Sequence, residues 1–214
     1  MYSLSQFTEE DQSRVMEFMH ANPFALLCGS DRNNHPVATQ VPVFIDRRGD
    51  QLFLSGHMMR KTDHHLGFEF NPNVLAVFTG PHTYVSASWY QDKRSASTWN
   101  YMSVHAHGKL SFLGHTELID VLKRTTNHFE NNPYSGANFD DIPRADVEQM
   151  AKAIVAFEVE VTSLKNVFKL SQNKNRDDYT SVVEHLGPAG GDSEKIAGEM
   201  VKREKELFDS GAKK

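Results

Sequence analysis

Between Phe24 and Ser55 the sequence alternates short apolar stretches with short runs of turn residues. Asp31–Pro36 and Arg47–Asp50 carry Asp, Asn, Gly and Pro, the residues that favour turns. The stretches around them are rich in apolar and β-branched residues, and strands are expected at 24–29, 37–45 and 51–55. Three short strands in succession at this spacing predict an antiparallel meander or barrel.

The rest of the chain alternates further strands with amphipathic segments. Strands are expected at 73–78, 97–112 and 154–164. Helices are expected from about 8 to 20 and at 60–70, 116–131, 144–153, 178–186 and 193–209. The expected N-terminal caps are Thr8, Thr116, and Asp192 or Ser193. The predicted fold class is α+β, mainly β: a barrel with helices at its rim.

Composition limits the classes of function. The 214 residues are 39% apolar and 24% charged, as expected for a globular protein with a sizeable core. The net charge of −5 weighs against strong non-specific DNA binding. No apolar run approaches the roughly 20 residues that span a bilayer, and no signal peptide is evident. The single cysteine, Cys28, excludes an internal disulfide, so a cytoplasmic location is expected.

The stretch 78–110 is rich in aromatic residues set among Ser, Thr, Asn and His. It holds both tryptophans of the chain, and its aromatic residues include Tyr84, Trp89, Tyr90, Trp99 and Tyr101. Aromatic faces beside small donors and acceptors suit a flat ligand with polar edges. The alternative is an aromatic-rich barrel core, which this stretch by itself predicts equally well.

Three separated motifs carry a resemblance to a known family. PHTYVSASWY at 81–90, TWNYMSVHAHGKL at 98–110 and FKLSQNKN at 168–175 occur in the order found in the PaiB family. Members of that family are described as FMN-binding negative transcriptional regulators with a split β-barrel, like that of pyridoxamine-phosphate oxidases. The resemblance implies FMN as cofactor and a homodimer with the flavin site at the subunit interface. It also implies a barrel domain at 1–175 and a helical C-terminal appendage at 176–214, packed on the same domain.

The segment from Ser55 to Thr62 is the candidate phosphate site. It follows a strand and opens a helix, where spare backbone donors point outward. In the pyridoxamine-phosphate oxidases a similar Arg-Lys pair after the equivalent strand holds the FMN phosphate, so the resemblance implies this role for Arg60 and Lys61. His57, in the same segment, is a further candidate cofactor contact. The alternative is that both cations only solvate the start of the helix, although cations are unfavourable at that end of the helix dipole.

The other candidate cofactor contacts come from three segments. In related barrels the strand with Thr39 and Gln40 lies beneath the isoalloxazine, although ordinary strand alternation would explain much of its pattern. Trp99 and Asn100 would flank the ring from the second subunit, or Trp99 would anchor the interface. The family motif at 168–175 adds Lys169, Ser171 and Gln172, for which the alternative is a polar turn that leads into a helix.

The sequence leaves three functions open and assigns no catalytic residue. The first is a PaiB-like regulator, with DNA or another regulatory partner but without a visible helix-turn-helix. The second is an FMN-dependent oxidoreductase, whose proton donor would be His57, His105 or Tyr84. The third is a haem-binding or haem-degrading protein that uses His57, His82, His105 or His107. A protein metal site is not expected, because His105 and His107 lack a third ligand at fixed spacing.

Overall fold

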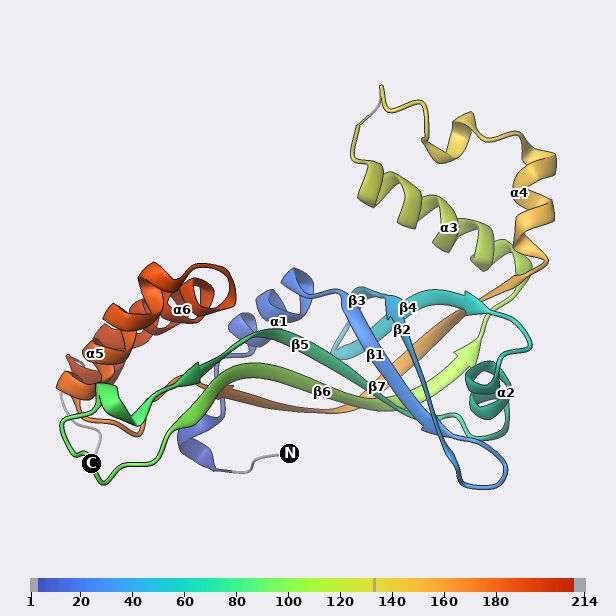
Figure 1. The fold of residues 1–214 in the computed structure, drawn as a ribbon. Helices are drawn as coiled ribbons and strands as arrows, with labels where there is room; N and C mark the ends of the chain where they lie inside the picture. The colour runs from blue at the N-terminus through green and yellow to red at the C-terminus, as the bar shows by residue number, and fades with distance from the viewer. Residues whose placement is uncertain (1–3, 133, 210–214) are drawn as a thin grey trace. The chain divides into compact units, whose positions relative to one another are not determined.

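The computed structural model describes residues 4–132 and 134–209, so the last five residues of the predicted appendage lie outside it (Figure 1). Its strands form one antiparallel sheet in the order β2-β1-β5-β6-β7-β4-β3. The chain divides into two compact units. Unit 1 comprises Met1–Phe18, Thr79–Val104 and Lys165–Lys214, and unit 2 comprises Met19–Phe78 and His105–Leu164. The long strands β5 (Asn73–Val85), β6 (Thr98–Phe112) and β7 (Ile154–Lys169) contribute residues to both.

Unit 2 contains the short strands predicted from the turn pattern. They are β1 (Phe24–Ser30), β2 (Pro36–Pro42), β3 (Phe44–Arg48) and β4 (Gln51–Met59). Strand β1 pairs with β2 so that Leu26 faces Gln40, and β4 pairs with β7 so that Gly56 faces Phe157. The buried positions alternate along these strands, as in β4, where Leu54 is fully buried and its neighbour Phe53 is not. Such alternation gives each strand one core face.

The sheet of unit 2 curls until β2 approaches β4. A side chain at Gly56 would place its Cβ 2.8 Å from the Pro42 carbonyl oxygen and 2.9 Å from the Phe157 ring. Glycine is therefore required where the end of β2 packs on β4. This contact brings two strands together that carry predicted cofactor residues.

Three helices belong to unit 2: α2 (Asp63–Phe70), α3 (His115–Glu130) and α4 (Arg144–Ala151). A short 3-10 helix, η3 (Phe139–Asp141), lies between α3 and α4. Leu118 and Val121 on the apolar face of α3 are buried in one cluster with Ala151 and Ala156. Helix α3 ends at Asn131, whose left-handed conformation closes the last turn.

Unit 1 contains the helices near both ends of the chain. They are η1 (Ser5–Phe7), α1 (Gln12–Ala21, shared with unit 2), η2 (Ala87–Trp89), α5 (Arg176–Leu186), η4 (Gly187–Ala189) and α6 (Gly191–Phe208). In its core the rings of Phe18 and Phe168 meet edge to face at 5.2 Å. The buried Tyr179 hydroxyl donates to the Met200 carbonyl at 2.8 Å, which joins α5 to α6. Of the described helices, none is long and apolar enough to cross a membrane.

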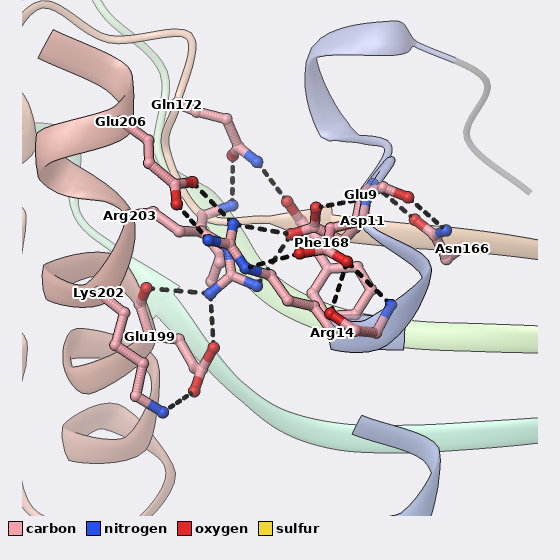
Figure 2. A network of polar contacts seen from close by, with 12 residues as sticks. Glu9, Asp11, Arg14, Asn166, Phe168, Gln172, Glu199, Lys202, Arg203 and Glu206 are labelled. Atoms are coloured by element: carbon pink, nitrogen blue, oxygen red, sulfur yellow. Dashed lines mark hydrogen bonds and ion pairs between the residues drawn. The ribbon is translucent and has the colours of Figure 1, made fainter. Parts of the chain in front are cut away.

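A polar network joins the N-terminal segment of unit 1 to α6 and β7 (Figure 2). Arg203 of α6 donates to Glu9 at 3.2 Å and to Glu199 at 2.5 Å. Asn166 of β7 accepts from the Glu9 amide at 2.8 Å and donates to the Glu9 carbonyl at 3.0 Å. Arg203 is only 8% exposed, so its charge is balanced inside the protein rather than by water.

The predicted helix caps are wrong. Helix α1 starts after Asp11, whose carboxylate accepts from the Ser13 amide at 2.9 Å, so Thr8 is not its cap. Helices α3 and α6 follow glycines, Gly114 and Gly190, and neither has a side-chain cap. Glycine tolerates the backbone angles before a helix, notably the φ of +72° at Gly190, so the expected caps at 116 and at 192 or 193 are not needed.

Four predicted strands also have different bounds. The strands expected at 51–55 and 73–78 are longer, because β4 continues to Met59 and β5 to Val85. The stretch 37–45 is divided between β2 and β3, because the Val43 amide donates to the Pro23 carbonyl at 2.9 Å and so leaves the strand ladder. The strand expected to end at Leu164 continues as β7 to Lys169. The continuation places most of its last residues, Val167 and Phe168 among them, in the core of unit 1.

Candidate functional site

Strand β4 ends in a turn that presents two exposed cations. The Arg60 amide donates to the Ala153 carbonyl at 2.9 Å, and its Nε donates to the Ile154 carbonyl at 2.7 Å. Lys61 follows with a φ of +62°, so the chain reverses there before α2 begins. The anchored Nε fixes the direction of the Arg60 guanidinium, and both side chains remain accessible to a ligand.

The backbone donors at the start of α2 are largely used within the protein. Thr62 caps the helix, and its Oγ1 accepts from the His65 amide at 3.3 Å. The Asp63 carboxylate accepts from the His64 amide at 2.8 Å. The expectation of spare donors at this helix start is therefore wrong for these two amides. A phosphate at this turn would depend on the side chains of Arg60 and Lys61.

His57 of β4 has a buried nitrogen without a hydrogen-bond partner. Among the described residues nothing pairs with its Nδ1, and the ring is otherwise half-buried. Burial lowers the pKa of His57, which favours the neutral imidazole. A buried polar nitrogen left unpaired costs free energy, so this atom is a candidate contact for a bound group with its own donor or acceptor.

Strand β2 places Thr39 and Gln40 at the edge of the sheet. Thr39 is half-buried opposite Leu27, whereas Gln40 is exposed opposite Leu26. The contact of Pro42 with Gly56 holds the end of this strand against β4. Within unit 2 the structure thus brings the strand of Gln40 next to the strand that carries His57 and leads to Arg60 and Lys61.

In unit 1, Trp99 lies in an exposed aromatic cluster. Its ring is 52% exposed, meets Tyr84 edge to face at 6.0 Å and lies 6.1 Å from the His82 ring. His82 in turn lies 3.7 Å from the Asp192 carboxylate. A large exposed aromatic surface of this kind is typical of a binding surface, which agrees with either predicted role of Trp99.

Three other predicted contacts of unit 1 form hydrogen bonds with their own neighbourhood. Asn100 is fully buried and its amide donates to the Ser171 hydroxyl at 2.9 Å. Gln172 accepts from the Leu170 amide at 2.6 Å and donates to the Phe168 carbonyl at 2.5 Å. Ser171 has a φ of +63°, so these bonds hold a tight turn ahead of α5. Their contact with a cofactor stays a prediction.

Lys169, at the end of β7, is half-buried beside that turn. Its Nζ donates to the Thr98 hydroxyl at 2.5 Å and lies 5.9 Å from the Phe7 ring centre. Burial lowers the pKa of the Lys169 ammonium. The ten predicted cofactor residues therefore fall into two sets, five in unit 2 and five in unit 1.

The histidines considered for metal or haem are dispersed. His105 and His107 are both half-buried on β6, whereas His82 is exposed on β5. Across residues 4–132 and 134–209, the structure contains no group of three His, Cys, Asp or Glu side chains placed to hold a metal ion. Cys28 is half-buried, and burial raises the pKa of its thiol, as suits a packing residue.

One set of polar side chains in unit 2 was missed in the sequence. Arg124 of α3 forms a two-point ion pair with Asp46 of β3 at 2.6 and 2.8 Å. The two residues are 78 positions apart, and neither belongs to a motif, so no local signal indicates the pair.

Comparison with known proteins places the chain in a family. Residues 1–163 match the family described as "Putative FMN-binding domain". The chain is 31% identical, over 87% of its length and 89% of the relative's, to "Protease synthase and sporulation protein PAI 2" of Bacillus subtilis.

Solved structures show the same fold at low identity. The flavocytochrome Anf3 of Azotobacter vinelandii is 15% identical with a TM-score of 0.56, over 84% of this chain and 78% of that one. A conserved hypothetical protein of Mycobacterium tuberculosis is 11% identical with a TM-score of 0.56, over 82% and 95%. The predicted split β-barrel with C-terminal helices is confirmed. By its sequence match over most of its length, this chain belongs to the family described as "Putative FMN-binding domain".

Proposed function

We propose that this chain binds FMN in unit 2, with the phosphate at Arg60 and Lys61 and the ring system toward His57 and Gln40. The observation that carries the proposal is the unpaired, buried Nδ1 of His57, three residues before two exposed cations on the same strand end. Family membership supports the choice of ligand.

The phosphate contact follows from charge and preorganisation. A phosphate monoester carries nearly two negative charges, and two cations would balance them. The Arg60 guanidinium is already held by its Nε contact with Ile154, so fewer rotamers are lost when its outer N–H groups bind an anion. Lys61 adds a mobile point charge from the neighbouring position of the turn.

The ring contacts rely on the neutral state of His57. A neutral imidazole can donate or accept at Nδ1, so it can pair with either kind of atom at a flavin edge. Gln40 can likewise donate and accept from the adjoining strand, with Thr39 beside it. Bound FMN would supply electron and hydride transfer, which these residues would orient and tune.

The biological role that we propose for the FMN-binding protein is regulatory. The Bacillus subtilis relative is named "Protease synthase and sporulation protein PAI 2". The idea of a regulator that uses a flavin comes from the resemblance of the three motifs to the PaiB family. The net charge of −5 favours a protein partner over direct DNA binding. We further propose that the protein is a cytoplasmic homodimer. In this dimer the exposed Trp99 of each subunit contributes to the flavin site of the other subunit. Lys169 and the turn at 171–172 contribute to the same flavin site.

The test compares FMN with riboflavin, which has the same ring and no phosphate. The double variant Arg60→Ala/Lys61→Ala should weaken FMN binding about 100-fold or more, since each charge-assisted contact contributes about 1.5–3 kcal/mol. Its affinity for riboflavin should change less than about threefold. Quenching of flavin fluorescence would measure both.

The matched control is Arg47→Ala/Lys109→Ala. These two exposed cations also lie in unit 2, on β3 and β6, and their removal changes the net charge equally. The control should bind FMN like the wild type. Equal loss of FMN affinity in both double variants would show a general charge effect, and wild-type affinity in Arg60→Ala/Lys61→Ala would refute the phosphate site.

A further inference from the structure

Unit 2 contains a cleft of about 280 Å³ that is not formed by the proposed phosphate turn. It opens between the β2–β3 connection and helix α3, and the end of α1 contributes His20. Its walls include Pro42, Phe44, Arg124, His128 and Phe129. Among the described residues that line this wall there is no Asp or Glu, and Arg124 carries the one fixed charge.

Arg124 is oriented by two neighbours and keeps N–H donors that no described residue uses. Its two terminal nitrogens donate to the Asp46 carboxylate at 2.6 and 2.8 Å, and its guanidinium carbon lies 4.0 Å from the centre of the Phe44 ring. A guanidinium has five N–H groups, and this ion pair uses two. The other three have no acceptor among the described residues, so an anion in the cleft could bind them.

Asp46 orients Arg124 without belonging to the cleft wall. The hydrogen bonds from Arg124 lower the pKa of Asp46, although partial burial opposes this effect. The carboxylate therefore stays charged at neutral pH and keeps the guanidinium stacked on Phe44. Preorganisation of this kind reduces the entropy lost when a ligand binds.

Aromatic rings form the rest of the recognition surface. The His128 ring meets Phe44 edge to face at 5.5 Å and meets Phe129 at 4.9 Å. Phe129 is 56% exposed, although it is a large apolar side chain on a helix with a buried face available to it. Exposed aromatic rings beside an oriented guanidinium match a flat ligand with an anionic end.

We infer that this cleft binds a small planar carboxylate, such as an aromatic acid. Its ring would pack against Phe44 and Phe129, and its carboxylate would accept from Arg124 and His128. The inference does not depend on FMN binding, because Arg60 and Lys61 do not line the cleft.

The probe is 2-naphthoate, whose fluorescence reports binding, with the neutral 2-naphthalenemethanol as its comparator. Naphthoate should bind the wild-type protein about tenfold or more tightly than the alcohol, because a charge-assisted contact is lost in the alcohol. Arg124→Gln should reduce naphthoate affinity to that of the alcohol. Arg124→Lys keeps the positive charge but loses the planar guanidinium with its paired N–H donors, so it should give an intermediate affinity for naphthoate.

Arg48→Gln is the matched control. Arg48 also pairs with a carboxylate, Glu158 at 2.5 Å, and lies 4.4 Å from the Phe53 ring centre, but it does not line the cleft. This variant should keep naphthoate affinity within about twofold of wild type, as expected for an exposed pair elsewhere. Equal affinities for naphthoate and the alcohol, or equal loss in Arg124→Gln and Arg48→Gln, would overturn the inference.

The final arm repeats the titration with saturating FMN. Retained naphthoate affinity, with the Arg124→Gln effect unchanged, would support a separate site. Displacement by FMN would assign the cleft to the flavin and overturn the inference while leaving FMN binding intact. Failure of FMN to bind, with naphthoate binding unchanged, would refute only the FMN proposal.

Discussion

Asn100 shows how one polar residue can specify the packing of unit 1. It is fully buried, and it exchanges hydrogen bonds with Ser171 at 2.9 and 3.2 Å across 71 positions of sequence. Ser171 is itself 3% exposed, in a turn with a φ of +63°. Loss of either partner would leave a buried polar group unsatisfied, which costs more than the bond itself contributes.

The residue-scale prediction is a thermodynamic coupling between these two side chains. Asn100→Ala should lower the free energy of unfolding by about 1–3 kcal/mol, and Ser171→Ala should lower it by less. The loss in the double variant should be smaller than the sum of the two single losses by about 1 kcal/mol, because the second substitution removes a group that has already lost its partner. Urea unfolding would measure all three against Asn33→Ala, an exposed turn position. If the loss in the double variant equals the sum of the two single losses, the hydrogen bonds between Asn100 and Ser171 do not contribute to stability and the prediction is refuted.

At the scale of elements, strands β6 and β7 approach each other closely at Gly108. A Cβ at this position would lie 2.5 Å from the Glu160 carbonyl oxygen and 2.5 Å from Val159 Cγ1. Backbone atoms cannot move away as a flexible side chain can. The glycine is therefore fixed by sheet packing rather than by backbone conformation.

Gly108→Ala should lower the free energy of unfolding by about 1–3 kcal/mol, because it overpacks the sheet. Gly198→Ala is the control, since nothing lies within 4 Å of a Cβ at that exposed position of α6. It should raise the free energy of unfolding by roughly 0.5–1 kcal/mol through helix propensity. Equal effects of the two alanines in thermal or urea unfolding would contradict the close approach.

Arg203 forms the buried part of the contact between α6 and the N-terminal segment, beside the more exposed Arg14–Glu206 pair (Figure 2). Arg203→Met should lower the free energy of unfolding by about 3 kcal/mol, because Glu9, with 11% of its side chain exposed, loses its nearest buried cation. Adding Glu9→Gln should recover part of the loss. Lys202→Met, at a side chain that is 71% exposed, should cost under about 1 kcal/mol. A similar cost for both methionines would contradict a buried pair.

The same network has a defined pH dependence. Burial by itself raises the pKa of Glu199, but hydrogen bonds from Lys202 and Arg203 outweigh it and the pKa falls below its ordinary value of 4.5. A lowered folded-state pKa gives stability that is present above the unfolded-state value and lost as the pH falls through the folded-state value. The acid-induced loss of stability below about pH 4.5 should therefore be smaller in Glu199→Gln than in the wild type, measured by urea unfolding at several pH values.

For the whole molecule, sequence patterns predicted where strands and helices lie better than which strands pair with each other. The long strand expected at 97–112 is β6 (Thr98–Phe112), and the expected short strands and most helices occur within a few residues. Periodicity reveals such elements because side-chain burial repeats along them. Pairings such as Gly56 with Phe157 join distant parts of the chain and leave no local pattern.

For the candidate site, the sequence predicted residues but not their surroundings. The motif resemblance led to Arg60, Lys61 and His57, which lie on one strand end. It could not reveal that Asn100, Ser171 and Gln172 bond to their own surroundings, nor that Arg124 meets Asp46. Those contacts depend on side-chain packing between elements far apart in sequence.

FMN binding by this chain can be measured on the purified protein. The purified protein would be mixed with FMN, separated from free ligand by gel filtration, and examined by visible absorption. A flavin spectrum should elute with the protein in stoichiometric amount. Complete loss of flavin on the column, or a Soret band with no flavin spectrum, would contradict it.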